Sequence, residues 1–515
     1  MKITFVYAAW ENLGIEYLSA ILKEKGHDTE LVFDPQLFDD TAVSIGFLKK
    51  SFSYEKKVVG QIVNSKPDLV AFSVVSSSYV WSCKIARQVK KRLKVPVVFG
   101  GIHPTSVPDE VIKKNFIDFV VVGEGFGAMP ELAECLEKGK SPEKSNMSYN
   151  IQNVWFKKNG KIIRNKLRPL VEDLDSLPFP DKDLYYQKLP YFKGTNYTTI
   201  TGLGCPFSCT YCNNSILKKL YMNNGKYLRR RSVDNVIREL KERKHKYKIK
   251  GVIFQDEIFI YDLKWLEEFS AKYKKEVGIP FFCWVHPGMI NGNTVNLLKS
   301  AGCQEVDMGI QTMSPETRKE ILHRNVSNKQ IKQAIRLLRK AGIWITTDNI
   351  FGLPGQTEEE LLEMARFYSE NRVGLVSVYW LSYFPKTEIV DIARKRGILD
   401  DSDIYKINNA LIPEFCVTKN THISSDKIKN ANAKNFSRIK NLVYFSAYAP
   451  KKLVSYIIKK RIFKLFPSAN MFMINAFIAR IKNMMLGNKR VILTDKISYQ
   501  YLYFVVKKII PWKDR

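Results

Sequence analysis

Short apolar runs alternate with amphipathic stretches over the first 140 residues of the 515-residue chain. Apolar side chains recur at helical spacing between the runs, as at Ile15, Leu18, Ile21 and Leu22. This alternation predicts a flavodoxin-like doubly wound α/β domain over residues 1–140, whose ligand lies at the carboxyl ends of the strands. The runs are rich in Val, Ile and Phe and predict strands at Lys2–Tyr7, Thr29–Phe33, Leu69–Val75, Val95–Gly100 and Asp118–Gly123.

The rhythm stops over residues 141–195, where prolines and Asn-Gly turns predict a small hairpin and an ordered linker. It resumes over residues 196–400 with six strand-helix units. Six units are too few for a closed eight-stranded barrel, so we expect a partial (βα)6 TIM-type barrel, open on one side, with its chemistry at the carboxyl ends of the strands. The predicted strands are Tyr197–Gly202, Gly251–Asp256, Phe281–His286, Glu305–Gln311, Trp344–Phe351 and Leu375–Ser382.

Three of the eight cysteines are clustered as C-x3-C-x2-C directly after the first predicted barrel strand, at Cys205, Cys209 and Cys212. Scattered single thiols elsewhere are typical of a reducing cytoplasm rather than of a disulfide framework. Three thiolates suit three irons of a 4Fe-4S cluster and leave the fourth iron open. A structural zinc site is the alternative, but it normally needs four ligands, and the nearest histidine, His245, is far along the chain.

This loop resembles that of the radical SAM superfamily. The resemblance implies that the open iron binds S-adenosylmethionine, whose reductive cleavage yields a 5'-deoxyadenosyl radical. Tyr211 matches the family's aromatic position beside the adenine, with packing of the loop as the alternative.

Further segments match the same family. The resemblance implies that Asp256 and Glu257 bind the methionyl amino group, with a solvated acidic turn as the alternative. Gln311 resembles the ribose contact, and Asn349 opens a segment, NIFGLPGQT, like the one that flanks the adenine. His286 stands where many relatives have Arg, so that role is not carried over.

Gly100-Gly101 follows the fourth predicted strand, and Gly123-Glu124-Gly125 follows the fifth. Together with the serine run Ser76-Ser77-Ser78, these turns resemble the cobalamin-binding domain of class B radical SAM methylases and of the anaerobic Mg-protoporphyrin cyclase-like enzymes. The D-x-H-x-x-G motif of histidine-ligated cobalamin proteins is absent, so we expect base-off cobalamin without a histidine on cobalt; His103 is a polar contact or an ordinary loop residue. Glycines at strand ends permit close backbone approach and hydroxyls can bond the nucleotide tail. The expected cobalamin contacts are Ser76, Ser77, Gly100, Gly101, His103, Thr105, Gly123, Glu124 and Gly125.

The combined resemblance implies a cobalamin-dependent radical SAM enzyme that methylates an unactivated carbon of a small molecule or lipid, with flavodoxin or ferredoxin as external electron donor. A non-methylating oxidoreductase or cyclase is the first alternative. A cobalamin-binding sensor is the second, which the intact cysteine triad disfavours.

Charge sets the last region apart. The chain has a net charge of +31, and residues 401–515 predict a mostly helical basic domain with no acidic residue between Asp426 and Asp495. Basic and apolar residues interleave between Lys451 and Phe466, a pattern typical either of a helix on an anionic membrane surface or of one packed on the barrel. Nucleic acid is a poor fit, because no RNA-binding module accompanies the charge. Without a signal peptide or a spanning apolar run, we expect a cytoplasmic protein with peripheral membrane contact as the open question. Cys416 is either a packing residue or a thiol with a catalytic role.

Overall fold

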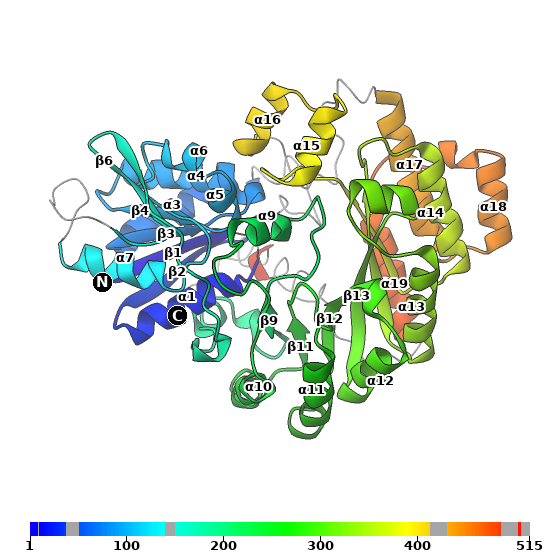
Figure 1. Ribbon diagram of the computed structural model, residues 1–515, viewed down its shortest axis with the longest axis horizontal. Helices are drawn as coiled ribbons and strands as arrows, with labels where there is room; N and C mark the ends of the chain where they lie inside the picture. The colour runs from blue at the N-terminus through cyan, green and yellow to red at the C-terminus, as the bar shows by residue number, and fades with distance from the viewer. Residues whose placement is uncertain (9, 38–50, 140–149, 412–429, 486–502, 506–515) are drawn as a thin grey trace.

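The computed structural model describes residues 1–8, 10–37, 51–139, 150–411, 430–485 and 503–505 (Figure 1). Two parallel sheets lie side by side, one in the N-terminal domain and one in the barrel, as the sequence predicts for this α/β fold. Helices flank both sheets, because strands of nearly continuous Val, Ile and Phe are buried on both faces.

The N-terminal sheet has the strand order β2-β1-β3-β4-β5-β6-β7, in which the first five strands are parallel. The last two strands come from the predicted linker and add an antiparallel hairpin to the sheet edge. The strands are β1 (Lys2–Ala8), β2 (Asp28–Asp34), β3 (Leu69–Ser73), β4 (Val97–Gly100), β5 (Phe119–Val121), β6 (Val154–Lys158) and β7 (Lys161–Arg164). The helices are α1 (Leu13–Glu24), α3 (Glu55–Ser65), α4 (Ser76–Lys90), α5 (Ile102–Ser106), α6 (Pro108–Ile112) and α7 (Ala128–Glu137).

Three short helices, η1 (Leu174–Ser176), α8 (Asp183–Tyr186) and η2 (Pro190–Phe192), lead to the barrel. Its six parallel strands form an open sheet in the order β15-β14-β13-β12-β11-β8. They are β8 (Asn196–Thr199), β11 (Gly251–Phe254), β12 (Phe281–Val285), β13 (Cys303–Gln311), β14 (Trp344–Phe351) and β15 (Leu375–Trp380), with a separate pair β9 (Gly202–Leu203) and β10 (Arg229–Arg230). The helices are α9 (Asn213–Leu220), α10 (Val233–Tyr247), α11 (Leu263–Glu276), η3 (Pro287–Met289), α12 (Gly292–Ala301), η4 (Thr317–Ile321), α13 (Asn328–Lys340) and α14 (Glu358–Glu370).

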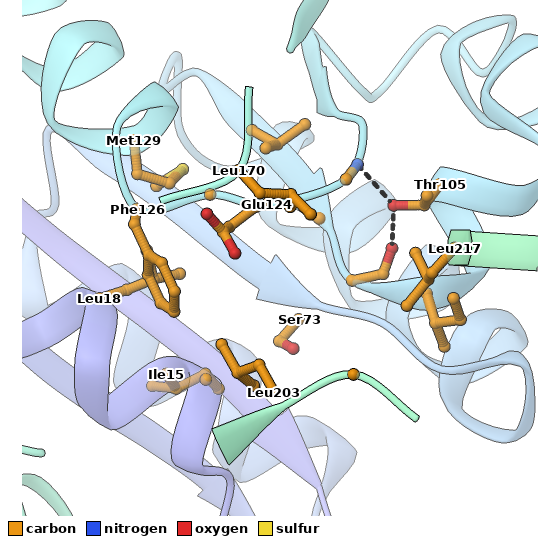
Figure 2. Close-up of a pocket in the computed structure, with 18 of the residues that line it drawn as sticks. Ile15, Leu18, Ser73, Thr105, Glu124, Phe126, Met129, Leu170, Leu203 and Leu217 are labelled. Carbon is orange, nitrogen blue, oxygen red and sulfur yellow. Dashed lines mark hydrogen bonds between the residues drawn. The ribbon is translucent and has the colours of Figure 1, made fainter. Parts of the chain in front are cut away.

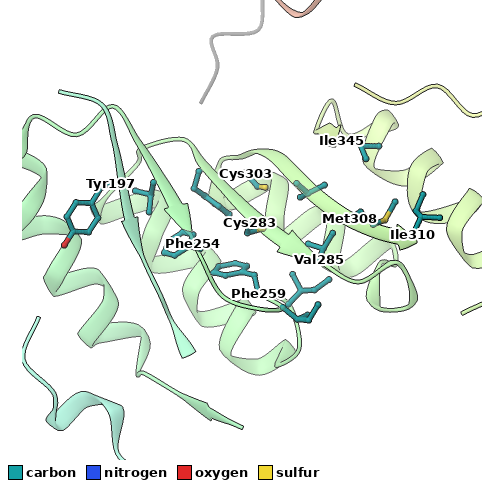
Figure 3. Packing of buried hydrophobic residues seen from close by; sticks show 14 of the residues in the cluster. Tyr197, Phe254, Phe259, Cys283, Val285, Cys303, Met308, Ile310 and Ile345 are labelled. Carbon is teal, nitrogen blue, oxygen red and sulfur yellow. The ribbon is translucent and has the colours of Figure 1, made fainter. Parts of the chain in front are cut away.

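The barrel core lies between the strands and their helices (Figure 3). Cys283 and Cys303 belong to this core and are 0% and 3% exposed, so they are packing residues, as expected. Cys416 lies outside the described residues.

The C-terminal helices are α15 (Glu388–Lys395), α16 (Asp401–Asn408), α17 (Asn430–Ser446), α18 (Lys451–Lys459), η5 (Ile462–Leu465) and α19 (Phe472–Met485). Of these, α17 and α19 contact β15, the open edge strand of the barrel sheet. The Asn475 amide donates to the Val376 carbonyl at 2.8 Å, and the Tyr444 hydroxyl donates to the Val378 carbonyl at 3.3 Å. These side chains satisfy backbone acceptors on the edge strand β15, which would otherwise invite pairing with another chain. Within the described chain, no helix combines the length and apolarity that crossing a bilayer requires.

Candidate active site

The three clustered cysteines lie on the loop between β9 and α9, beyond the first barrel strand. Cys212 occupies the position directly before α9, and Cys209 is 7% exposed. Gly204, just before the first cysteine, has a φ of 92°, and a Cβ there would lie 2.4 Å from the Tyr227 carbonyl oxygen. Only glycine fits this left-handed turn, which directs the chain into the cysteine loop.

Two side-chain donors reach the cysteine sulfurs, one from a segment far along the chain and one from the first turn of α9. The Arg324 guanidinium donates to the Cys209 Sγ at 3.5 Å and to the Gly309 carbonyl at 2.6 Å. The Asn214 amide lies 3.7 Å from the Cys212 Sγ. Donors aimed at sulfur stabilise thiolates, so this second set of residues suits a cluster. Sequence reasoning missed both; the position of Asn214 two residues after Cys212 was the available signal.

Burial raises the pKa of Cys205 to about 12 and that of Cys212 to about 11. Such thiols stay protonated at neutral pH unless a cation replaces the proton, which is what iron does. Nowhere in the described part of the chain, the cysteine loop included, do three His, Cys, Asp or Glu side chains lie close enough together to bind a single metal ion.

The two predicted acidic residues point in different directions. The Asp256 carboxylate is buried and accepts hydrogen bonds from the Thr201 amide at 2.9 Å and the Thr201 hydroxyl at 2.5 Å, with Arg230 at 3.7 Å. Glu257 is exposed instead and lines the cavity described below. In this structure the carboxylate of the pair that faces the cavity therefore belongs to Glu257, which also interacts with the Asn214 side chain.

The remaining predicted S-adenosylmethionine contacts lie around the barrel interior. Gln311 ends β13 in the left-handed region, with a φ of 71°. Asn349 is fully buried: its amide donates to the Ser377 carbonyl, and its oxygen accepts from the Tyr368 hydroxyl, both at 2.9 Å. Its side chain is thus engaged in the barrel wall. Tyr211 packs beside an apolar cluster that contains Ile350, as its packing alternative requires.

A pair of carboxyl groups inside the barrel was not singled out from the sequence. Asp307 of β13 and Asp348 of β14 interact, and burial raises the pKa of Asp348 to about 7 and that of Asp307 well above its usual range. Two close carboxyls in a low-dielectric space share a proton near neutral pH.

A cavity of about 350 Å³ lies over the carboxyl ends of the N-terminal strands (Figure 2). Of the predicted cobalamin contacts, its wall contains Gly100, Gly101, Thr105, Gly123, Glu124 and Gly125. The Thr105 hydroxyl ties two of these turns together, donating to the Gly101 carbonyl at 2.8 Å and accepting from the Gly123 amide at 2.9 Å. Ser73, which the sequence did not single out, also lines the wall.

Two glycines of this wall, Gly101 and Gly123, are sterically required. At Gly101, whose φ is 99°, a Cβ would lie 2.7 Å from the Val74 carbonyl oxygen. At Gly123, whose φ is 79°, a Cβ would lie 2.0 Å from the Tyr221 hydroxyl. The bare backbone here lets both a ligand and the barrel approach closely.

The other predicted contacts lie behind the wall or away from it. His103 is fully buried, its Nδ1 lies 2.9 Å from the Ser76 hydroxyl, and its ring lies 4.2 Å from that of Tyr79. Burial lowers the pKa of His103 to about 4, so the imidazole is neutral at ordinary pH. Ser77 is exposed on α4. Neither serine nor His103 is among the residues lining the cavity.

Barrel residues close the cavity from the opposite side, including Leu203, Leu217, Gln255 and Glu257. The cavity therefore runs from the N-terminal strand ends to the neighbourhood of the cysteine loop. At the rim of the cavity, Glu124 joins the N-terminal domain to the barrel. One Glu124 carboxylate oxygen pairs with Arg229 of β10 at 2.8 Å, and the other accepts from the Val171 amide at 2.9 Å.

Arg229 belongs to a run of three arginines that sequence reasoning missed. Arg230 approaches Asp256, and Arg231 pairs with Glu239 at 2.6 Å. All three side chains are nearly buried, at 3–7% exposed. Arg229 connects this segment with the domain opposite, whereas Arg230 and Arg231 bind carboxylates of the barrel itself.

Comparison with known proteins agrees with this architecture. Residues 199–368 match the model of the radical SAM superfamily, and residues 3–133 match that of the B12 binding domain. The chain is therefore a radical SAM enzyme that carries a B12-binding domain.

Its relatives include an uncharacterized methyltransferase of Pyrococcus horikoshii, 27% identical over 86% of this chain and 89% of that protein. The anaerobic magnesium-protoporphyrin IX monomethyl ester cyclase of Rubrivivax gelatinosus is 24% identical over 73% of this chain and 64% of the cyclase. Among solved structures, the cobalamin-dependent S-adenosylmethionine radical enzyme OxsB matches with a TM-score of 0.65 and 14% identity, over 99% of this chain and 80% of that one. This likeness extends the shared fold to both domains.

Proposed function

We propose that this enzyme is a cobalamin-dependent methylase that transfers a methyl group to an unactivated carbon of a small molecule or lipid. The observation that carries the proposal is the single cavity shared by the strand ends of both domains. Groups bound at facing strand ends meet over one substrate, which is the main contribution that a protein makes to cofactor chemistry. The methyltransferase relative from Pyrococcus horikoshii supports the reaction class.

When bound, a 4Fe-4S cluster supplies the electron that cleaves S-adenosylmethionine, and cobalamin supplies the methyl-carrying metal. Cys205, Cys209 and Cys212 hold the cluster as thiolates, and Arg324 and Asn214 orient two of the sulfurs through their N–H donors. The Glu257 carboxylate, open to the cavity, binds the methionyl ammonium. Asp256 acts through Thr201, by holding the strand end in place.

We further propose that cobalamin would bind base-off, with no histidine of this domain as a ligand to cobalt. Two observations support it: His103 is buried with its Nδ1 on Ser76, and the described residues that line the cavity include no histidine. The glycine turns at residues 100–101 and 123–125 accept the corrin and its tail through backbone and hydroxyl groups.

The alternative is a non-methylating oxidoreductase, and the similarity to the Rubrivivax gelatinosus cyclase supports it. An external one-electron donor such as flavodoxin or ferredoxin serves either reaction. The two differ in their use of S-adenosylmethionine, because methylation leaves S-adenosylhomocysteine beside 5'-deoxyadenosine, whereas oxidation leaves 5'-deoxyadenosine alone.

The test is an anaerobic incubation of the reconstituted, cobalamin-loaded enzyme with dithionite and S-adenosylmethionine, in which both nucleosides are quantified. The proposal expects both products, and their loss in Cys205→Ala. Cys135→Ser, a thiol on α7 remote in sequence from the loop, is the matched control. 5'-Deoxyadenosine without S-adenosylhomocysteine would favour the oxidoreductase.

A further inference from the structure

Exposed apolar side chains are concentrated in the C-terminal helices. The described part of the chain exposes fifteen large hydrophobic residues, and nine of them lie between residues 445 and 481. They are Phe445, Leu453, Tyr456, Leu465, Met473, Ile474, Phe477, Ile478 and Ile481. Single exposed hydrophobics are ordinary on a protein surface, but a concentration of this kind marks an interaction site.

Five of these residues form one ridge along α19. Met473, Ile474, Phe477, Ile478 and Ile481 follow helical spacing and are 42–63% exposed. The opposite side of the helix faces the barrel, where Asn475 bonds β15 and Ala479 is 3% exposed. α19 is therefore anchored by its small and polar side and presents its large apolar side outward.

α18 and η5 present a basic surface. Val454, Ile457 and Ile458 of α18 are buried, and the helix contacts α14, so its own apolar side is already used for packing. Lys451 pairs with Glu370 and Arg461 with Glu358, which fasten this segment to α14.

The outward side of the same segment keeps its charge. Lys452, Lys459, Lys460 and Lys464 are exposed, and no carboxylate of the described residues pairs with them. Exposed Tyr456 and Leu465 stand among them, with Leu465 83% exposed. The stretch 430–485 contains no acidic residue at all. Figure 1 places α18 at the end of the molecule away from the N-terminal domain, with α17 and α19 on the same side of it but further in.

The barrel helix α13 provides a comparison within the same chain. It also exposes basic residues, Lys329, Lys332, Arg336 and Lys340, yet it exposes no large hydrophobic residue. A basic helix of that kind is an ordinary solvated face. Within the part of the chain that the structure describes, exposed Ile and Phe side chains occur in the C-terminal helices alone, and exposed cations accompany them there.

α17 contacts both η5 and α19, so the basic side of α18 and η5 and the ridge of α19 belong to one group of packed helices. We propose that this group docks on an anionic lipid membrane through those two features. Charge complementarity selects the partner: lysines bind acidic headgroups, while apolar side chains of this size enter the headgroup boundary. Nucleic acid would not bury the aliphatic ridge, and a second copy of this surface would set lysines against lysines. Docking stands independently of the methylase reaction. If that proposed function holds, docking also keeps the enzyme at a surface that contains lipid substrates.

The experiment is flotation of the full-length protein with vesicles of phosphatidylglycerol in phosphatidylcholine, against vesicles of phosphatidylcholine alone. We expect binding to the anionic vesicles at low salt, a steep loss at high salt, and little binding to the neutral ones. Lys452→Glu with Lys459→Glu and Lys460→Glu should weaken binding by about a hundredfold or more, because each basic residue near such a surface contributes about 1 kcal/mol.

Ile474→Ser with Phe477→Ser and Ile478→Ser should also weaken binding by about a hundredfold, through lost apolar burial. Lys332→Glu with Arg336→Glu and Lys340→Glu on α13 reverses the same number of charges and should change binding little. Equal loss in the α13 variant, or binding unaffected by either C-terminal variant, would overturn the proposal. So would a self-associating protein that the serine variant converts to monomers, since the occupant would then be a second copy.

S-adenosylmethionine cleavage in detergent-free solution should be unchanged in all three variants, which also shows that they are folded. This readout separates the two proposals. Vesicle binding tests the docking surface, whereas S-adenosylmethionine cleavage tests the proposed function, so either one can fail while the other holds.

Discussion

The two strand edges that meet at the cavity are built in opposite ways. The N-terminal edge consists mainly of glycine turns and apolar side chains, with Thr105 as an internal tie. The barrel edge carries thiols, carboxylates and buried arginines. Bare backbone suits a large ligand that must come close, whereas convergent charged groups suit a small polar ligand and a metal cluster. The difference assigns the two cofactors to the two edges on chemical grounds.

The largest expected effect comes from the barrel edge. Cys205→Ala removes one cluster ligand and should abolish 5'-deoxyadenosine formation, because three thiolates are the whole protein ligand set of such a cluster. Iron content and the visible absorption of the reconstituted protein measure the cause directly. Cobalamin retention should survive the change, and its loss would show that the two edges do not act separately.

Gly101→Ala tests the N-terminal edge in the same way. The backbone region that Gly101 occupies strains an L-residue by about 1–3 kcal/mol, and the added Cβ meets the Val74 carbonyl at 2.7 Å, so unfolding should require about 3 kcal/mol less. Cobalamin should be lost from the purified protein while the cluster still forms. Gly60→Ala on α3, where a Cβ meets nothing within 4 Å, is the control and should be neutral or slightly stabilising.

Glu124→Gln weakens the ion pair that joins the N-terminal domain to the barrel and removes neither a glycine of the N-terminal turns nor a cysteine of the loop. Arg229 is 4% exposed, so loss of the charge beside it should lower the free energy of unfolding by about 2 kcal/mol, because hydrogen bonds to charged groups contribute about that much. We expect the ratio of S-adenosylhomocysteine to 5'-deoxyadenosine to fall, because only the former needs both domains aligned. A double mutant with Arg229→Gln should be less destabilised than the sum of the single changes, and strict additivity would contradict the pairing.

The smallest effect concerns pH and the buried imidazole behind the N-terminal edge. The pKa of His103 falls to about 4 in the folded protein and returns to about 6.5 on unfolding, so the unfolded state binds the proton more readily. Stability is therefore retained above pH 6.5 and lost as pH falls, by about 1 kcal/mol between pH 7 and pH 5.5. Chemical denaturation across this range measures the slope. His103→Gln should flatten it, and an unchanged slope would assign the dependence to other groups.

Several site residues were identifiable from the sequence because they are local. The cysteine spacing, the six-unit barrel and the glycine turns at residues 100–101 and 123–125 follow from short-range patterns. Roles carried by side-chain direction were not identifiable in this way. Asp256 and Glu257 are adjacent in sequence, yet one is buried on Thr201 and the other opens to the cavity. Asn349 lies in a matching segment, but its amide bonds Ser377 and its oxygen bonds Tyr368.

By itself, then, the sequence determined the order of strands and helices, the cluster-binding loop and the class of both domains, because periodicity, glycine turns and cysteine spacing act over a few residues. Only the tertiary structure decided which groups meet. The contacts of Arg324 with Cys209, of Glu124 with Arg229 and of Asn475 with β15 join segments about a hundred residues apart. The tertiary structure likewise decided that α18 buries its apolar side while α19 exposes its large apolar side chains. Burial and long-range pairing depend on how the whole chain closes on itself, and no local pattern contains that information.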